Sequence, residues 1–207
     1  SSIWGGTASI SPYTTNKESG HGPAWINSLF EDNAEHGLGM QIGYETVRAN
    51  LITKVEALKG KNADLDAAID NFLATKNNTK ANDAPAKALV AALEADGSAE
   101  AAEILKDKQY LAKKSFWIFG GDGWAYDIGY GGLDHVLASG HDVNVMVFDT
   151  EMYSNTGGQA SKASNIGEVC QFAAAGKEIS KKSLAEICMT YGYIYVAQIA
   201  LGANMAQ

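Results

Sequence analysis

Two short apolar runs, each followed at once by oxygen-bearing residues, constrain the fold of this chain more than any other feature. The first run, residues 115–121, has the sequence Ser-Phe-Trp-Ile-Phe-Gly-Gly and leads into Asp122 and Gly123. The second, residues 143–149, has the sequence Val-Asn-Val-Met-Val-Phe-Asp and leads into Thr150. Short apolar runs bounded by turn residues are typical of strands buried in a parallel sheet.

A segment with helical spacing separates the two runs. It carries Ile128, Leu133 and Val136, and Gly140 is placed to end it. Further along, a third helix is expected from Ser183 and a third strand over residues 193–199. This alternation predicts an α/β fold with a doubly wound parallel sheet, in which ligands bind beyond the carboxyl ends of the strands. The residues after 119 and after 149 are therefore the ones to inspect.

Residues from about 48 to 114 differ from their flanks, being dense in Ala, Lys, Asp, Asn and Leu. Their spacing predicts amphipathic helices over residues 64–75, from Asp83 to Gly97, and from Ser98 onward. We interpret residues 1–207 as one domain with this helical insertion, whose polar faces are solvated. A further helix is expected from Pro23. The absence of an initial Met suggests a fragment or one part of a longer polypeptide.

Composition excludes several classes of protein. A net charge of -8 argues against nucleic acid and anionic membranes as partners, because such surfaces need clustered Lys and Arg. No apolar run has the length of a membrane span, and no signal peptide is recognisable, so we expect a cytoplasmic protein. Cys170 and Cys188 are the only cysteines and do not form a C-x-x-C pair, so no iron–sulfur ligand set is expected.

The polar residues at the two strand ends have the chemistry of a magnesium site. If the strands are adjacent and parallel, Asp122 can share one Mg²⁺ with Thr150 and the backbone carbonyl of Met152. Gly121 and Gly123 would let backbone N–H groups approach a phosphate, beside a helix N-terminus near Trp124. Gly-Asp-Gly is also an ordinary turn sequence, so spacing alone leaves that alternative open.

The amino-acid sequence around both strand ends closely resembles that of the thiamine diphosphate domain of pyruvate:ferredoxin (flavodoxin) oxidoreductases. The resemblance covers residues 120–140, beginning Gly-Gly-Asp-Gly-Trp-Ala-Tyr-Asp-Ile-Gly, and residues 149–162, including Tyr-Ser-Asn-Thr-Gly-Gly-Gln. It extends to residues 1–5, 12–16, 22–25, 27–32 and 191–197, while the expected insertion shows no match. That family carries Thr where many other thiamine enzymes have Asn, and this chain has Thr150 at that position.

The resemblance implies roles for individual residues. Asp122, Thr150 and the Met152 carbonyl would ligate Mg²⁺, and Gly121 and Gly123 would approach the diphosphate. Asn155 matches a residue that lies over the thiazolium and contacts the substrate bound there, so it is the catalytic candidate. Phe30 matches an aromatic residue that contacts the cofactor, although a helical Phe is equally well explained as core.

The resemblance also implies an activity: oxidative decarboxylation of pyruvate to acetyl-CoA, with electrons passing through [4Fe–4S] clusters to ferredoxin or flavodoxin. In that chemistry the cofactor carries the difficult step. A glutamate for the aminopyrimidine and the cluster cysteines would come from other domains or subunits, and the complete enzyme would be a homodimer. We therefore expect this chain alone to be inactive as an oxidoreductase.

Three alternative hypotheses about the function stay open. One is another thiamine enzyme, such as a 2-oxoacid decarboxylase or a transketolase-like protein. The second is a 2-oxoacid:ferredoxin oxidoreductase with a different substrate. The third is a non-catalytic module that kept the fold and lost the cofactor, against which the retained Asp122, Thr150 and Asn155 argue.

Overall fold

The computed structural model describes residues 34–200 and 202, which fall into two compact units. Residues 37–117 and 142–144 form the helical unit, and residues 118–141 and 145–200 lie in the site unit, together with residues 34–36. The expected aromatic contact Phe30 and the helix start at Pro23 lie outside the described residues.

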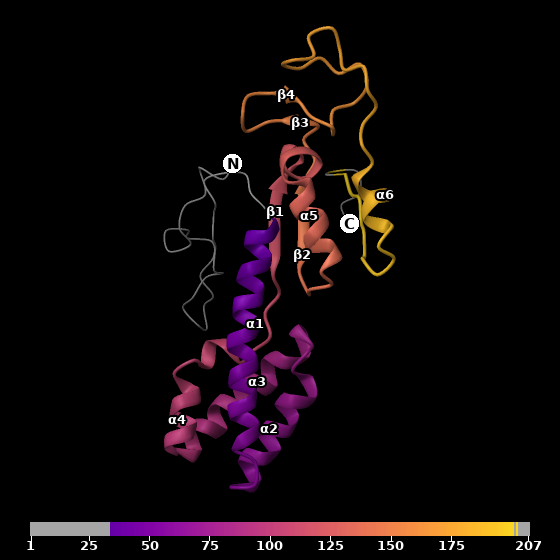
Figure 1. Cartoon of the computed structure of the whole chain (residues 1–207). Coiled ribbons are helices and arrows are strands. Elements are labelled where there is room, and N and C mark those ends of the chain that lie inside the picture. The colour runs from indigo at the N-terminus through magenta and orange to yellow at the C-terminus, as the bar shows by residue number, and fades with distance from the viewer. Residues whose placement is uncertain (1–33, 201, 203–207) are drawn as a thin grey trace. The chain divides into compact units, whose positions relative to one another are not determined.

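The helical unit contains four α-helices and one 3₁₀ turn: α1 (Ala34–Ala57), α2 (Ala63–Thr75), α3 (Thr79–Asp96), α4 (Ala99–Leu105) and η3 (Lys108–Tyr110) (Figure 1). The expected helices at 64–75 and after Ser98 are confirmed. Helix α3 begins earlier than Asp83, because the Asn78 side chain accepts a hydrogen bond from the Ala81 N–H at 2.9 Å and so caps the helix there. Gly97 ends α3 with φ +63°, as expected.

Helix α1 continues without a break through residue 48, where the insertion was expected to begin. Because no element boundary falls at residue 48, the helices do not mark where an insertion would begin, and the insertion at about 48–114 stays a prediction. The core of the helical unit is apolar and is contributed by all four helices, with Leu51, Val55, Leu65, Ile69, Phe72, Leu89, Leu93 and Ile104 each at most 2% exposed. Burial of these side chains is the main force that stabilises such short helices, which are marginal in isolation.

A buried polar network crosses this apolar core. Arg48 is 3% exposed, and its Nε donates to the Leu111 carbonyl at 3.0 Å. Its Nη2 donates to the Lys76 carbonyl at 2.8 Å and to Asn82 Oδ1 at 3.3 Å. Asn82 is fully buried and also accepts from the Lys113 N–H at 2.9 Å. The guanidinium thus satisfies carbonyl groups near the ends of α2 and η3, which would otherwise lack partners.

Asn82→Ala is expected to lower the free energy of unfolding by about 2–3 kcal/mol, because it leaves buried donors of Arg48 and Lys113 without an acceptor. Urea unfolding followed by far-ultraviolet circular dichroism measures this change. Asn77→Ala, at an exposed turn position, is the matched control and should change the free energy by less than about 0.5 kcal/mol. Equal effects of the two substitutions would contradict the network's role.

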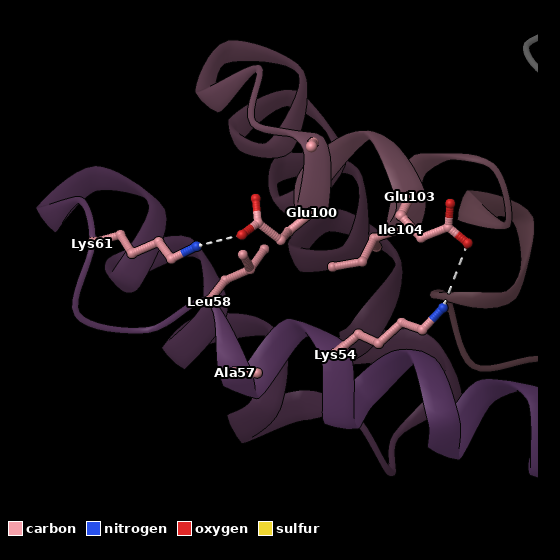
Figure 2. A pocket seen from close by; sticks show the side chains of 8 residues that line it. Lys54, Ala57, Leu58, Lys61, Glu100, Glu103 and Ile104 are labelled. Carbon is pink, nitrogen blue, oxygen red and sulfur yellow. Dashed lines mark hydrogen bonds and ion pairs between the residues drawn. The ribbon is translucent and has the colours of Figure 1, made fainter.

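The helical unit also carries a groove of about 550 Å³ between the end of α1 and α4. Figure 2 shows an apolar floor that includes Leu58 and Ile104, with charged side chains at the rim. Lys54 pairs with Glu103 at 3.8 Å, and Lys61 pairs with Glu100 at 3.3 Å. Exposed pairs of this kind contribute little to stability. None of the residues predicted to bind a cofactor lines this groove.

The site unit has the expected α/β character. Strands β1 (Trp117–Gly121) and β2 (Asn144–Phe148) are neighbours in one parallel sheet. Between them the chain forms a π-helical turn, η4 (Gly123–Ile128), and helix α5 (Tyr130–Ala138) (Figure 1). Strands β3 (Met152–Tyr153) and β4 (Gln159–Ala160) follow as an antiparallel hairpin, and α6 (Leu184–Met189) comes near the end. The first two expected strands and the crossover between them are confirmed.

One expectation in the site unit is wrong. Residues 193–199 are not a strand in the described chain, and Tyr193, Tyr195 and Ile199 are 60%, 90% and 56% exposed. A strand needs a neighbour for its backbone hydrogen bonds, and an apolar run alone does not supply one. The helix expected to begin near Trp124 is present: it begins as the π-helical turn η4 at Gly123 and is followed by α5 from Tyr130. Ser183 precedes α6 but its side chain makes no capping bond.

Candidate functional site

Asp122 lies at the end of β1, directly before η4, and only 1% of its surface is exposed. A carboxylate that deeply buried needs partners for its oxygens. Oδ1 accepts a hydrogen bond from Thr150 Oγ1 at 2.8 Å, and Oδ2 accepts one from Ser161 Oγ at 2.8 Å. The two ends of the parallel strands therefore meet at this carboxylate, as the sequence predicted.

The Thr150 hydroxyl oxygen and the Met152 carbonyl oxygen lie close to the Asp122 carboxylate and to each other. Thr150 Oγ1 lies 3.1 Å from the Met152 carbonyl oxygen and 2.6 Å from Ser154 Oγ. The intervening Glu151 has φ +67°, a left-handed conformation that is uncommon for a residue with a side chain. That conformation turns the backbone so that the Met152 carbonyl comes back toward Thr150. The three predicted metal ligands are thus gathered within hydrogen-bond distances of one hydroxyl.

This donor set fits Mg²⁺ in its chemistry. It offers one buried carboxylate, one hydroxyl and one backbone carbonyl, and a hard cation prefers such oxygens and usually completes its shell with phosphate oxygens and water. Among residues 34–200, no three His, Cys, Asp or Glu side chains come together as a metal site. A cation held by the described residues here would depend on Asp122 for protein charge and on neutral oxygens for the remaining contacts.

The other predicted site residues lie nearby, with different surroundings. Asn155 is exposed in the turn between β3 and β4. A Cβ atom added at Gly121 would meet nothing within 4 Å, so this glycine leaves open space beside the site. A Cβ atom at Gly123 would lie 2.3 Å from Cδ1 of Tyr153. Gly123 is therefore needed for the close approach of the Tyr153 ring, a role that the sequence did not reveal.

Gly123→Ala is expected to destabilise the site unit by about 1–3 kcal/mol without any cofactor present, because the new methyl group collides with the Tyr153 ring. Movement of Tyr153 would also displace the adjoining Met152 carbonyl. Thermal unfolding of the metal-free protein measures the effect.

Gly121→Ala is the matched comparison. We expect it to leave thermal unfolding nearly unchanged, since the added methyl group meets open space. If Gly121 approaches the diphosphate, this variant should weaken cofactor binding alone. Equal thermal stability of Gly123→Ala and the wild type would contradict the packing role of Gly123.

Several polar residues around the site were not singled out from the sequence. Ser161 and Ser164 are 5% and 0% exposed and lie in one turn after β4. Ser161 contacts Asp122, and the Ser164 hydroxyl donates to the Glu151 carbonyl. An isolated serine has no distinctive spacing that would single it out in the sequence. The one signal for Ser161 was that the resemblance to the thiamine diphosphate domain extends through residue 162.

Lys181 links the two acidic residues that flank Thr150. Its Nζ lies 2.8 Å from Asp149 Oδ2 and 3.4 Å from Glu151 Oε1. Burial lowers the pKa of Lys181, but the hydrogen bond and charge of Asp149, with Glu151, leave that pKa raised overall. Burial, together with the hydrogen bond to Asp149 at 2.9 Å, raises the pKa of Tyr126. These contacts anchor the segment that carries Thr150 while leaving Thr150 itself exposed.

Comparison with known proteins agrees with this geometry. Residues 95–207 match the family model described as thiamine pyrophosphate enzyme, C-terminal TPP binding domain, thiamine pyrophosphate being another name for thiamine diphosphate. The matched part includes both strand ends and the hairpin. The chain belongs to this family of thiamine diphosphate-binding domains.

Its relatives are more specific. The chain is 52% identical to the pyruvate:ferredoxin oxidoreductase of Moorella thermoacetica, over 100% of this chain and 18% of that protein. It is 49% identical to the pyruvate-flavodoxin oxidoreductase of Klebsiella pneumoniae, again over 100% and 18%. The NADP⁺-dependent pyruvate dehydrogenase of Euglena gracilis, described as mitochondrial, is 48% identical over 100% of this chain and 12% of its own length. The chain thus spans less than a fifth of these relatives.

A bilayer-crossing helix is absent from the part of the chain that the structure describes, since none of its helices is both long and apolar enough.

Proposed function

We propose that this chain is the diphosphate- and Mg²⁺-binding part of an enzyme that oxidatively decarboxylates pyruvate to acetyl-CoA. The observation that carries the proposal is the convergence of Asp122 Oδ1, Thr150 Oγ1 and the Met152 carbonyl oxygen at the ends of two parallel strands. The family match over residues 95–207 supports the choice of thiamine diphosphate, and the named relatives support the choice of pyruvate.

The residues of this chain have three tasks in that proposal. Asp122, Thr150 and Met152 would hold the metal ion, which would neutralise negative charge of the diphosphate. Gly121 leaves room for the diphosphate beside the site. When bound, thiamine diphosphate supplies the carbon nucleophile and the electron sink that decarboxylation requires. Asn155, exposed on the hairpin turn, is the side chain that would contact the substrate.

The names of the relatives support the electron acceptors in the proposal. Electrons would pass through [4Fe–4S] clusters, held by cysteines outside this chain, to ferredoxin or flavodoxin, which are the acceptors named for two relatives. CoA would take the acetyl group. Other domains or subunits would supply the glutamate for the aminopyrimidine and the cluster cysteines, in a cytoplasmic homodimer.

The test is the binding of thiamine diphosphate to the assembled enzyme, followed by tryptophan fluorescence with and without Mg²⁺. Trp124 is 3% exposed and lies two residues after Asp122 in the chain, so its fluorescence is a suitable reporter of binding at the site. The proposal expects saturable binding that requires Mg²⁺, and pyruvate-dependent reduction of a dye by the assembled enzyme but not by this chain alone. Failure of the assembled wild-type enzyme to bind the cofactor would overturn the proposal.

A further inference from the structure

The two oxygens of the Asp122 carboxylate have different surroundings. Oδ1 contacts Thr150, on the side where the proposed metal ligands gather. Oδ2 contacts Ser161, which is 5% exposed and comes from a different segment of the chain. A carboxylate with one oxygen held by a buried donor has a fixed plane, so the position of its other oxygen is fixed as well.

The hydrogen-bond pattern of Ser161 determines the direction of its contact with Asp122. Its Oγ accepts from the Ala163 N–H at 3.0 Å, and a backbone N–H can only donate. The hydroxyl proton is then available for Asp122 Oδ2, 2.8 Å away. Ser161 therefore donates a hydrogen bond to a carboxylate, and such a charge-assisted bond is stronger than one between neutral groups.

The Ser161 hydroxyl is itself held in place by the turn. The Ser161 N–H donates to Ser164 Oγ at 3.0 Å, and the Ser164 hydroxyl donates to the Glu151 carbonyl. Both serines are buried, so water does not compete freely for these contacts. The turn from Ser161 to Ser164 connects the Asp122 segment with the segment that carries Thr150 and Met152.

We propose that Ser161 is a positioning residue that fixes the Asp122 carboxylate so that Oδ1 is presented to Mg²⁺. This inference rests on the proposed function of the site. Residues that orient a metal ligand from behind commonly change metal affinity by roughly 10- to 100-fold when removed. Ser161 would act through Asp122 alone, without touching the metal or the cofactor.

The test is a Mg²⁺ titration of thiamine diphosphate binding in the assembled enzyme, comparing Ser161→Ala with the wild type by tryptophan fluorescence. Ser161→Ala is expected to raise the Mg²⁺ concentration at half-binding by roughly tenfold or more. Binding at saturating Mg²⁺ should reach the wild-type amplitude. Ser161→Thr keeps the hydroxyl and should restore the midpoint to within about threefold of the wild type.

Ser164→Ala separates positioning from a purely structural role. It removes a hydroxyl from the same buried turn without touching Asp122. We expect it to lower the thermal midpoint and to raise the Mg²⁺ midpoint less than Ser161→Ala does, because Ser164 accepts from the Ser161 backbone N–H and leaves the Ser161 hydroxyl free to donate to Asp122. Equal Mg²⁺ shifts for the two alanine variants, or no shift for Ser161→Ala, would overturn the proposal.

Two further measurements keep the test decisive if Ser161→Ala fails to fold. Ser161→Cys retains a side chain of similar shape with a weaker donor, and it should shift the Mg²⁺ midpoint in the same direction. In an Asp122→Asn background, the same change should have no additional effect on residual Mg²⁺ binding. An unshifted midpoint for Ser161→Cys contradicts positioning. Loss of all binding by the wild type would instead contradict the proposed function.

Discussion

Replacing Asp122 by alanine is expected to weaken Mg²⁺-dependent binding of thiamine diphosphate, lowering the apparent affinity by more than about 100-fold. Substitution of a residue that only hydrogen-bonds to a metal ligand already lowers metal affinity by roughly 10- to 100-fold. Asp122 is the proposed carboxylate ligand itself, so we expect a larger loss. Tryptophan fluorescence titrations of the assembled enzyme, with Mg²⁺ held constant, measure the loss.

Two other substitutions determine whether charge or shape is responsible. Asp122→Asn preserves the volume of this buried side chain but removes its charge, and it should lose nearly as much affinity as the alanine variant. Asp134→Asn is the matched control, because Asp134 lies on α5 and accepts a hydrogen bond from Tyr191 rather than from Thr150. Near-normal affinity in both Asp122 variants would show that Asp122 is not a ligand.

Phe72→Ala is expected to lower the free energy of unfolding of the helical unit by about 3–5 kcal/mol. Phe72 is 0% exposed and belongs to the apolar core cluster, so its removal leaves a cavity lined by apolar side chains. Urea unfolding followed by circular dichroism gives the difference, because this unit holds the longest helices of the described chain.

The controls for Phe72 address both size and location. Phe72→Leu fills much of the space and should cost roughly 1–2 kcal/mol. Lys87→Ala removes an exposed side chain on α3 that pairs with Asp83, and it should cost less than about 0.5 kcal/mol. A change below about 1 kcal/mol for Phe72→Ala would mean that the core cluster tolerates the cavity by collapsing.

The sequence was most informative where local pattern and three-dimensional position coincide. Asp122 and Thr150 each follow a buried apolar run, and parallel strands place their carboxyl ends at one edge of a sheet. The contact between these two residues could therefore be predicted from periodicity and the length of the crossover. Helices α2 and α4 were predictable for a similar reason, since Leu65, Ile69 and Phe72 recur at helical spacing in α2 and Ser98 caps the start of α4.

The features that the sequence did not reveal depend on contacts between distant residues. Ser161 reaches Asp122 across 39 positions, and no spacing rule connects a serine to a carboxylate over that separation. Gly123 could be read as a phosphate-binding glycine, whereas its lack of a side chain makes room for Tyr153. The expected strand at 193–199 failed because an apolar run does not specify which neighbour completes its hydrogen bonds.

The π turn between Asp122 and α5 has a consequence for the length of this segment. Its wide turn is closed by the Gly129 N–H, which donates to the Trp124 carbonyl five residues earlier at 2.8 Å. A turn of this kind corresponds to one residue more than an α-helix would use. Deleting one residue between Gly123 and Gly129 would therefore let this stretch close with α-helical hydrogen bonds, so that α5 keeps its direction relative to β1. A deletion of one residue among homologous chains should consequently be tolerated in this stretch, even where individual side chains vary.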